Sequence, residues 1–125
     1  MIIFLAENYL INKVQRPDVV GKWRGENFKY EFQFDFNTNQ FCNISIVNKI
    51  SGEEKFIQGK YQISFAKVPM TMTINKIRSL NHPLHTIIEF KDNSTIRVAK
   101  FSPKWRLRPI SFEYQSTIEL SRESY

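Results

Sequence analysis

The sequence predicts an all-β protein in which roughly eight antiparallel strands close into an up-and-down barrel. Residues 28–36 alternate aromatic and polar side chains without a break, so five rings share one face of a strand and need an interior. Further short alternating runs follow, separated by turn residues. No helical stretch between them is long enough for a parallel crossover, so neighbouring strands should be antiparallel. A β-sandwich is the alternative architecture.

A short helix over residues 1–17 is expected to cap one end of the sheet. Apolar side chains recur at nearly helical spacing from Ile3 to Val14, and the residue before Pro17 disfavours helix. We expect no signal peptide here, because no basic region precedes the apolar run and no cleavage site follows. No transmembrane segment is expected either, since no apolar run approaches the ~18–20 residues that a span requires.

The strands are predicted from alternating runs that end at turn residues. Asn37-Thr38-Asn39 ends the aromatic strand, and the turns at 51–54, 81–83 and 91–94 are rich in Gly, Asn, Ser and Pro. Pro69 and Pro103 interrupt two further runs. In chain order, the expected strands cover residues 19–23, 28–36, 41–47, 56–65, 70–77, 84–90, 95–101 and 110–120.

Composition favours a single cytoplasmic domain, residues 1–125, that binds rather than catalyses. Cys42 is the only cysteine, which excludes an internal disulfide and favours a reducing compartment. His82 and His85 are too few for a zinc site, so no metal is expected. No phosphate loop, nucleophile elbow or carboxylate pair is present, so no catalytic residue can be named.

The net charge is +6, and part of this excess is concentrated near the end of the chain. Five basic residues occur within twelve positions that contain no acid: Arg97, Lys100, Lys104, Arg106 and Arg108. Such a patch can attract nucleic acid, an anionic membrane, an acidic protein or a ligand carboxylate, or it can be a solvated strand edge. Nucleic acid is not expected, because the regular alternation places the rings inside, away from stacking.

Two motifs carry a family resemblance. Gly21-Lys22-Trp23 resembles the Gly-x-Trp that opens the first strand of lipocalins, in which a late arginine packs across the indole; Arg106 and Arg108 are the candidates. Residues 97–111 resemble the ending of the S-type phycobiliprotein lyases, lipocalin-like proteins of cyanobacteria and algae that carry bilins. Residues 59–65 and 108–112 are also similar to uncharacterised bacterial lipocalin-like domains.

The resemblance implies a lipocalin-like (calycin) protein that holds an amphipathic ligand, specifically a linear tetrapyrrole (bilin), in the cyanobacterial cytosol or plastid stroma. It also implies bilin-lyase chemistry, although this chain is shorter than those lyases and lacks their polar stretch after Gly-Lys-Trp. Arginines would pair with the propionates and aromatic rings would stack on the pyrroles. The predicted ligand-binding residues are Trp23, Tyr30, Phe32, Phe34, Tyr61, Arg106, Arg108 and Tyr114.

The rings can instead fill the barrel as a packed core. The protein would then have no small ligand and would act as an accessory or assembly factor for an acidic photosynthetic protein complex. Its partner-binding residues would be Arg97, Lys100 and Lys104. No cofactor is expected under either interpretation, apart from a bilin as ligand.

Overall fold

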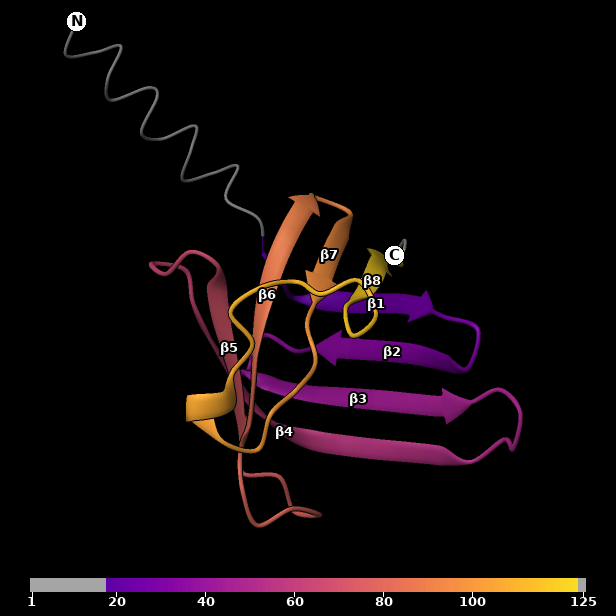
Figure 1. Ribbon diagram of the computed structural model, residues 1–125. Coiled ribbons are helices and arrows are strands. Elements are labelled where there is room, and N and C mark those ends of the chain that lie inside the picture. The colour runs from indigo at the N-terminus through magenta and orange to yellow at the C-terminus, as the bar shows by residue number, and fades with distance from the viewer. Residues whose placement is uncertain (1–17, 124–125) are drawn as a thin grey trace, which may run out of the picture.

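The computed structural model describes residues 18–123, which form a closed eight-stranded barrel and one short 3₁₀ helix (Figure 1). Each strand pairs antiparallel with its neighbour in sequence, and the last strand pairs with the first. The elements are β1 (Gly21–Glu26), β2 (Tyr30–Phe36), β3 (Phe41–Asn48), β4 (Glu54–Ser64), β5 (Met70–Asn75), β6 (Leu84–Asp92), β7 (Thr95–Val98), η1 (Trp105–Leu107) and β8 (Ile118–Arg122).

The predicted all-β, antiparallel, up-and-down barrel is confirmed, and the closure between β1 and β8 decides against an open sandwich. The helix expected over residues 1–17 lies outside the described residues. Within residues 18–123, no helix has the length and apolar character needed to cross a membrane.

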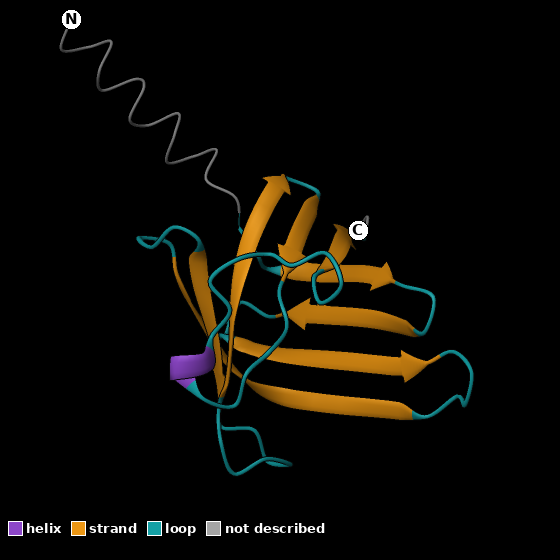
Figure 2. Cartoon of the chain, in the orientation of Figure 1, coloured by secondary structure: helices purple, strands orange, loops and turns teal. Residues whose placement is uncertain are grey.

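The barrel is flattened, so that β1–β4 cross β5–β7 at a steep angle (Figure 2). β4 belongs to both layers, because residues 54–60 pair with β3 and residues 60–64 pair with β5. A Cβ atom at Gly59 would lie 2.7 Å from the backbone oxygen of Asn75 and 2.7 Å from Cγ2 of Ile74. Glycine therefore permits the close approach of backbones where β4 changes partner.

Alternate residues of the strands fill the interior of the barrel. Phe34 and Phe36 are fully buried, whereas Tyr30 and Phe32 at the start of β2 are half-buried. The buried cluster consists of Val19, Trp23, Phe34, Phe36, Cys42, Ile44, Met72, Ile74, Ile77, Leu84, Ile88, Ile96, Val98 and Leu120.

One ring of the aromatic run lies outside the barrel, contrary to the sequence-based expectation. Phe28 is 91% exposed because β2 begins two residues later, at Tyr30. Asn27 turns the chain between β1 and β2, and its side-chain oxygen accepts hydrogen bonds from the backbone N–H groups of Lys29 and Tyr30. Because of this local turn, the alternation of inward and outward side chains begins at Tyr30 and does not include Phe28.

Arg122 packs across Trp23 and ties the start of the barrel to its last strand. The guanidinium carbon of Arg122 lies 4.2 Å from the centroid of the Trp23 ring. The same guanidinium donates hydrogen bonds of 2.7 and 2.6 Å to the backbone oxygens of Val20 and Asp18. The indole N–H of Trp23 in turn donates to the backbone oxygen of Val19 at 2.8 Å.

The expectation that Arg106 or Arg108 packs on Trp23 is therefore wrong. Arg122 lies directly opposite Trp23 in the pairing of β1 with β8, so its side chain reaches the indole from the neighbouring strand. Arg106 and Arg108 belong to residues 99–117, which we call the strap. The strap precedes β8 and crosses the outer face of β5 and β6 (Figure 1).

The position of the strap also corrects the predicted final strand, which was expected over residues 110–120. β8 begins at Ile118, because residues before it pack outside the barrel: the Phe112 ring lies 4.5 Å from the guanidinium carbon of Arg97 on β7. The strand expected over 95–101 ends at Val98; beyond it, a hydrogen bond of 3.2 Å from the backbone N–H of Ala99 to the oxygen of Ile87 and an isolated bridge from Ser102 to His85 continue the contact with β6.

We predict that Arg122→Ala lowers the free energy of unfolding by about 2–4 kcal/mol, because charge-assisted hydrogen bonds and a cation–π contact are lost together. Urea denaturation followed by circular dichroism measures this. Arg24→Ala is the matched control, since Arg24 forms only a surface ion pair with Glu123 (3.1 Å) and should cost less than about 1 kcal/mol. Equal losses in the two variants would contradict the role given to Arg122.

Candidate functional site

Several of the predicted ligand-binding rings belong to the packed core of the barrel. Trp23 meets the ring of Phe90 edge-on, with 6.3 Å between centroids, and Phe34 stacks on Phe101 at 6.3 Å. Both Trp23 and Phe34 are fully buried. These two rings therefore offer no open surface to a ligand.

The structure does not bring the eight predicted residues together. Tyr30 and Phe32 pack against each other at 6.1 Å in the half-buried part of the sheet, and Tyr114 is almost fully exposed in the strap. Arg106 and Arg108 line a hollow on the outer face of the barrel. Tyr61 lines a different hollow, at the rim of the barrel.

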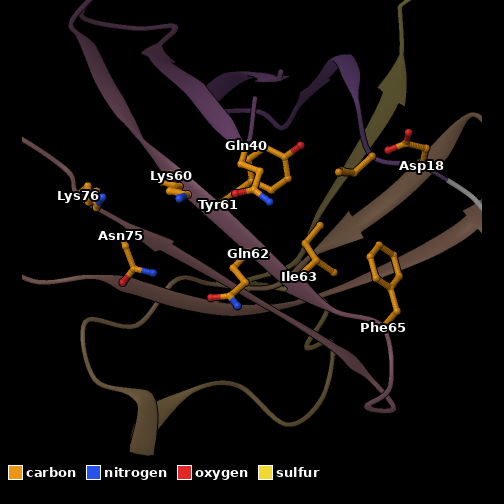
Figure 3. A pocket seen from close by; sticks show the side chains of 10 residues that line it. Asp18, Gln40, Lys60, Tyr61, Gln62, Ile63, Phe65, Asn75 and Lys76 are labelled. Atoms are coloured by element: carbon orange, nitrogen blue, oxygen red, sulfur yellow. The ribbon is translucent and has the colours of Figure 1, made fainter. Parts of the chain in front are cut away.

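The rim hollow has a volume of about 690 Å³, which is within the range of small-molecule sites. Tyr61 and Gln40 lie together at one edge of it (Figure 3). Ile63, Phe65 and the carboxylate of Asp18 lie on one side, and the polar residues on the other side are Lys60, Asn75 and Lys76 (Figure 3). One side of the hollow is therefore apolar apart from one carboxylate, and the other side is polar and basic.

The hollow exists because the C-terminal part of β4 extends past Phe41, the first residue of β3. β3 starts at Phe41, and the backbone N–H of Tyr61 still donates to the backbone oxygen of Gln40 at 2.8 Å. The residues of β4 after Tyr61 pair only with β5. Tyr61 and Ile63, which belong to the inward-facing set, are consequently half-buried instead of enclosed.

The environment of the ionisable groups near the rim shifts two pKa values. Burial, and then the nearby Asp18 carboxylate, raise the pKa of Tyr61, whose hydroxyl donates to the backbone oxygen of Asn37 at 2.8 Å. Burial raises the pKa of the Cys42 thiol to about 12, so this cysteine is not a nucleophile at neutral pH. In residues 18–123, no three His, Cys, Asp or Glu side chains gather as metal ligands.

Arg108 anchors the strap to the outer face of the sheet. Its guanidinium donates to Oγ1 of Thr73 on β5 at 2.7 Å and to Nδ1 of His85 on β6 at 2.9 Å. The backbone of His85 also exchanges two hydrogen bonds of 2.8 Å with that of Ser102 in the strap. His85 is thus buried under the strap as an acceptor, and Arg108 is held in place.

The predicted partner-binding residues are also separated by the structure. Arg97 donates to Glu89 at 2.8 Å and lies over the ring of Phe112, so it is engaged within the protein. Lys100 and Lys104 are exposed in the strap. Their roles in partner binding stay a prediction.

Sequence analysis did not identify Gln40, Ile63 or the two lysines of the rim hollow. The only related signal is that the alternating run predicted to contain Tyr61, residues 56–65, is longer than the run at residues 41–47; the pattern does not give the register at which β4 (eleven residues) extends past β3 (eight). A strand that outruns its partner leaves part of its inner face uncovered. The lysines carry no comparable signal, because surface lysines are common.

Comparison of the chain with protein-family models, curated proteins and solved structures gave no match. The fold and the sites described above therefore carry the functional argument.

We predict that stability falls at acid pH through His85. Burial, and then the charge of Arg108, lower the pKa of this imidazole, so the unfolded chain takes up a proton near pH ~6.5 before the folded protein does. The free energy of unfolding should therefore decrease as the pH falls below about 6.5. Urea denaturation at pH 7.5 and 5.5 should show a smaller decrease in His85→Gln than in the wild type. His82→Gln should keep the wild-type dependence; an unchanged dependence in His85→Gln would contradict the assignment.

Proposed function

We propose that this protein is a lipocalin-like binding protein that holds an amphipathic, anionic small molecule in the rim hollow. One observation carries the proposal: the hollow of about 690 Å³ places Ile63 and Phe65 on one side and Lys60 and Lys76 on the other. Such a site binds the apolar body of a ligand on one side and its charged groups on the other.

The charge around the hollow favours an anion. Two lysines, Lys60 and Lys76, line the hollow together with a single carboxylate, that of Asp18. In addition, no Asp or Glu occurs between residues 55 and 88 of the sequence. The Asp18 side chain already accepts a hydrogen bond from the backbone N–H of Val20 at 3.0 Å. Gln40 and Asn75 add donors that can hydrogen-bond carboxylate oxygens.

A linear tetrapyrrole is the specific candidate ligand. Its pyrrole rings suit the aromatic and aliphatic side of the hollow, where Tyr61 lies, and its two propionates suit the lysines. The resemblance of residues 97–111 to bilin lyases supports the same choice. The proposal is for binding; transfer of the ligand to a cysteine of another protein stays a prediction from the resemblance.

The alternative is an accessory factor that binds an acidic protein complex. It is supported by Lys100 and Lys104, which are exposed in a stretch, residues 93–112, that contains no acid. Ligand binding is preferred because the rim hollow supplies complementary apolar and charged surfaces, whereas Arg97, the third residue of the alternative, already pairs with Glu89.

Titration of the full chain with biliverdin, a linear tetrapyrrole, tests the proposal. We expect saturable one-to-one binding, seen as a change in the visible absorbance of the ligand. The double variant Lys60→Glu/Lys76→Glu should weaken binding at least about tenfold, because two attractive charges become repulsive. Lys100→Glu/Lys104→Glu is the matched control; it makes the same change of charge away from the hollow and should bind like the wild type.

Equal weakening in both double variants would show that net charge, and not the rim hollow, governs binding. Absence of saturable binding to the folded wild type would contradict the proposal. The alternative would then be favoured by association with an acidic polypeptide that falls steeply with salt and is lost in Lys100→Glu/Lys104→Glu.

A further inference from the structure

Four large apolar side chains project into solvent from neighbouring loops. Val68 belongs to the connection between β4 and β5, and Trp105, Leu107 and Ile110 belong to the strap. Their exposed fractions lie between 66% and 98%. Three basic residues alternate with them: Lys67, Lys104 and Arg106. We call these seven residues the docking face.

Five of the seven residues of the docking face line one hollow, and Lys104 and Leu107 are next to Trp105 and Arg106 in the sequence. Val68, Trp105, Arg106 and Ile110 surround a shallow hollow of about 440 Å³ whose lining includes the buried Ile87 of β6. Figure 1 shows η1 and the connection between β4 and β5 on the same side of the molecule. Residues distant in sequence thus present their apolar tips together.

The two sequence segments that carry this face are basic. Residues 55–88 and 93–112 contain no Asp or Glu, and each stretch holds five basic residues. These residues are Lys55, Lys60, Lys67, Lys76 and Arg78 in the first stretch, and Arg97, Lys100, Lys104, Arg106 and Arg108 in the second. Arg97 is the only one of them that forms an ion pair within residues 18–123.

The apolar tips are held in position by the fold. Arg108 fixes the strap to Thr73 and His85, and the backbone N–H of Leu107 donates to the oxygen of Lys104 at 3.0 Å. The guanidinium of Arg106 lies 5.7 Å from the centroid of the Trp105 ring. Binding therefore does not require the backbone of η1 to become ordered first.

We propose that the docking face binds the surface of an anionic lipid bilayer. Trp105, Leu107, Ile110 and Val68 would enter the interfacial region, where tryptophan in particular is favoured, while the basic side chains contact the headgroups. A bilayer fits better than a folded protein, because the exposed apolar side chains lie on two segments, the β4–β5 connection and the strap, and have basic residues beside them in both. A fluid anionic surface accommodates both kinds of side chain, whereas a rigid partner would need a matching pocket for each apolar one.

Vesicle sedimentation of the full chain tests this proposal, which does not depend on the proposed ligand. We expect binding to vesicles of phosphatidylcholine with 30% phosphatidylglycerol (about a third anionic lipid), weak binding to phosphatidylcholine alone, and weakening by salt. Tryptophan emission should shift to shorter wavelength on binding. The shift must come from Trp105, because Trp23 is buried in the core.

Two double variants make the test specific. Leu107→Ala/Ile110→Ala should lower the partition coefficient at least about tenfold, since several methylene groups no longer enter the interface. Phe28→Ala/Ile50→Ala removes equally exposed side chains, 91% and 82%, from hairpin tips outside the docking face and should bind like the wild type. All four positions are exposed, so neither variant should alter folding.

Binding to anionic vesicles no stronger than to neutral ones would overturn the proposal. So would equal weakening in the two double variants, or binding to a soluble acidic polypeptide without binding to vesicles, which would identify a protein partner.

Discussion

The barrel depends on the contact between Arg122 and Trp23. Only two residue pairs join β8 to β1, so the main-chain hydrogen bonds at this seam are few. The guanidinium of Arg122 supplements them by bonding to the backbone oxygens of Asp18 and Val20 and by covering the indole. One half-buried side chain thus fastens the first strand, the chain preceding it and the last strand. The wall at the rim hollow, which includes Val19, is placed by the same contact.

Filling of the interior determines where binding can occur. Trp23, Phe34 and Phe36 are fully buried in one cluster with aliphatic side chains from the other strands, and a ligand cannot displace them without loss of the core. The inner face of β4 is left partly uncovered at Tyr61 and Ile63, because there β4 extends past the first residue of β3. The change of partner that Gly59 permits therefore produces both the crossed layers and the rim hollow.

The fold could be predicted from the sequence because the alternation of apolar and polar side chains is a local signal. Each alternating run predicts one strand without reference to the rest of the chain. The boundaries near Phe28 and Ile118 were wrong because side-chain caps and packing on the outer face override alternation. The partner of Trp23 was misassigned because register across the seam, not distance along the chain, places Arg122. The rim hollow depends on the relative lengths of two strands, which a pattern of single strands does not give.

The distribution of charge is not explained by the barrel itself. Glu89 pairs with Arg97, and Lys91 pairs with Glu119, so ion pairs are made where acids are near. In residues 55–88 and 93–112, ten Lys and Arg residues occur without any Asp or Glu, and their mutual repulsion does not stabilise the free protein. An arrangement that costs stability and is not required by packing is expected where an anion binds. The rim hollow and the docking face both take their lysines and arginines from these basic segments: Lys60 and Lys76 line the hollow, and Lys67, Lys104 and Arg106 belong to the docking face. Anion binding at the two sites would explain why a small barrel retains so asymmetric a surface.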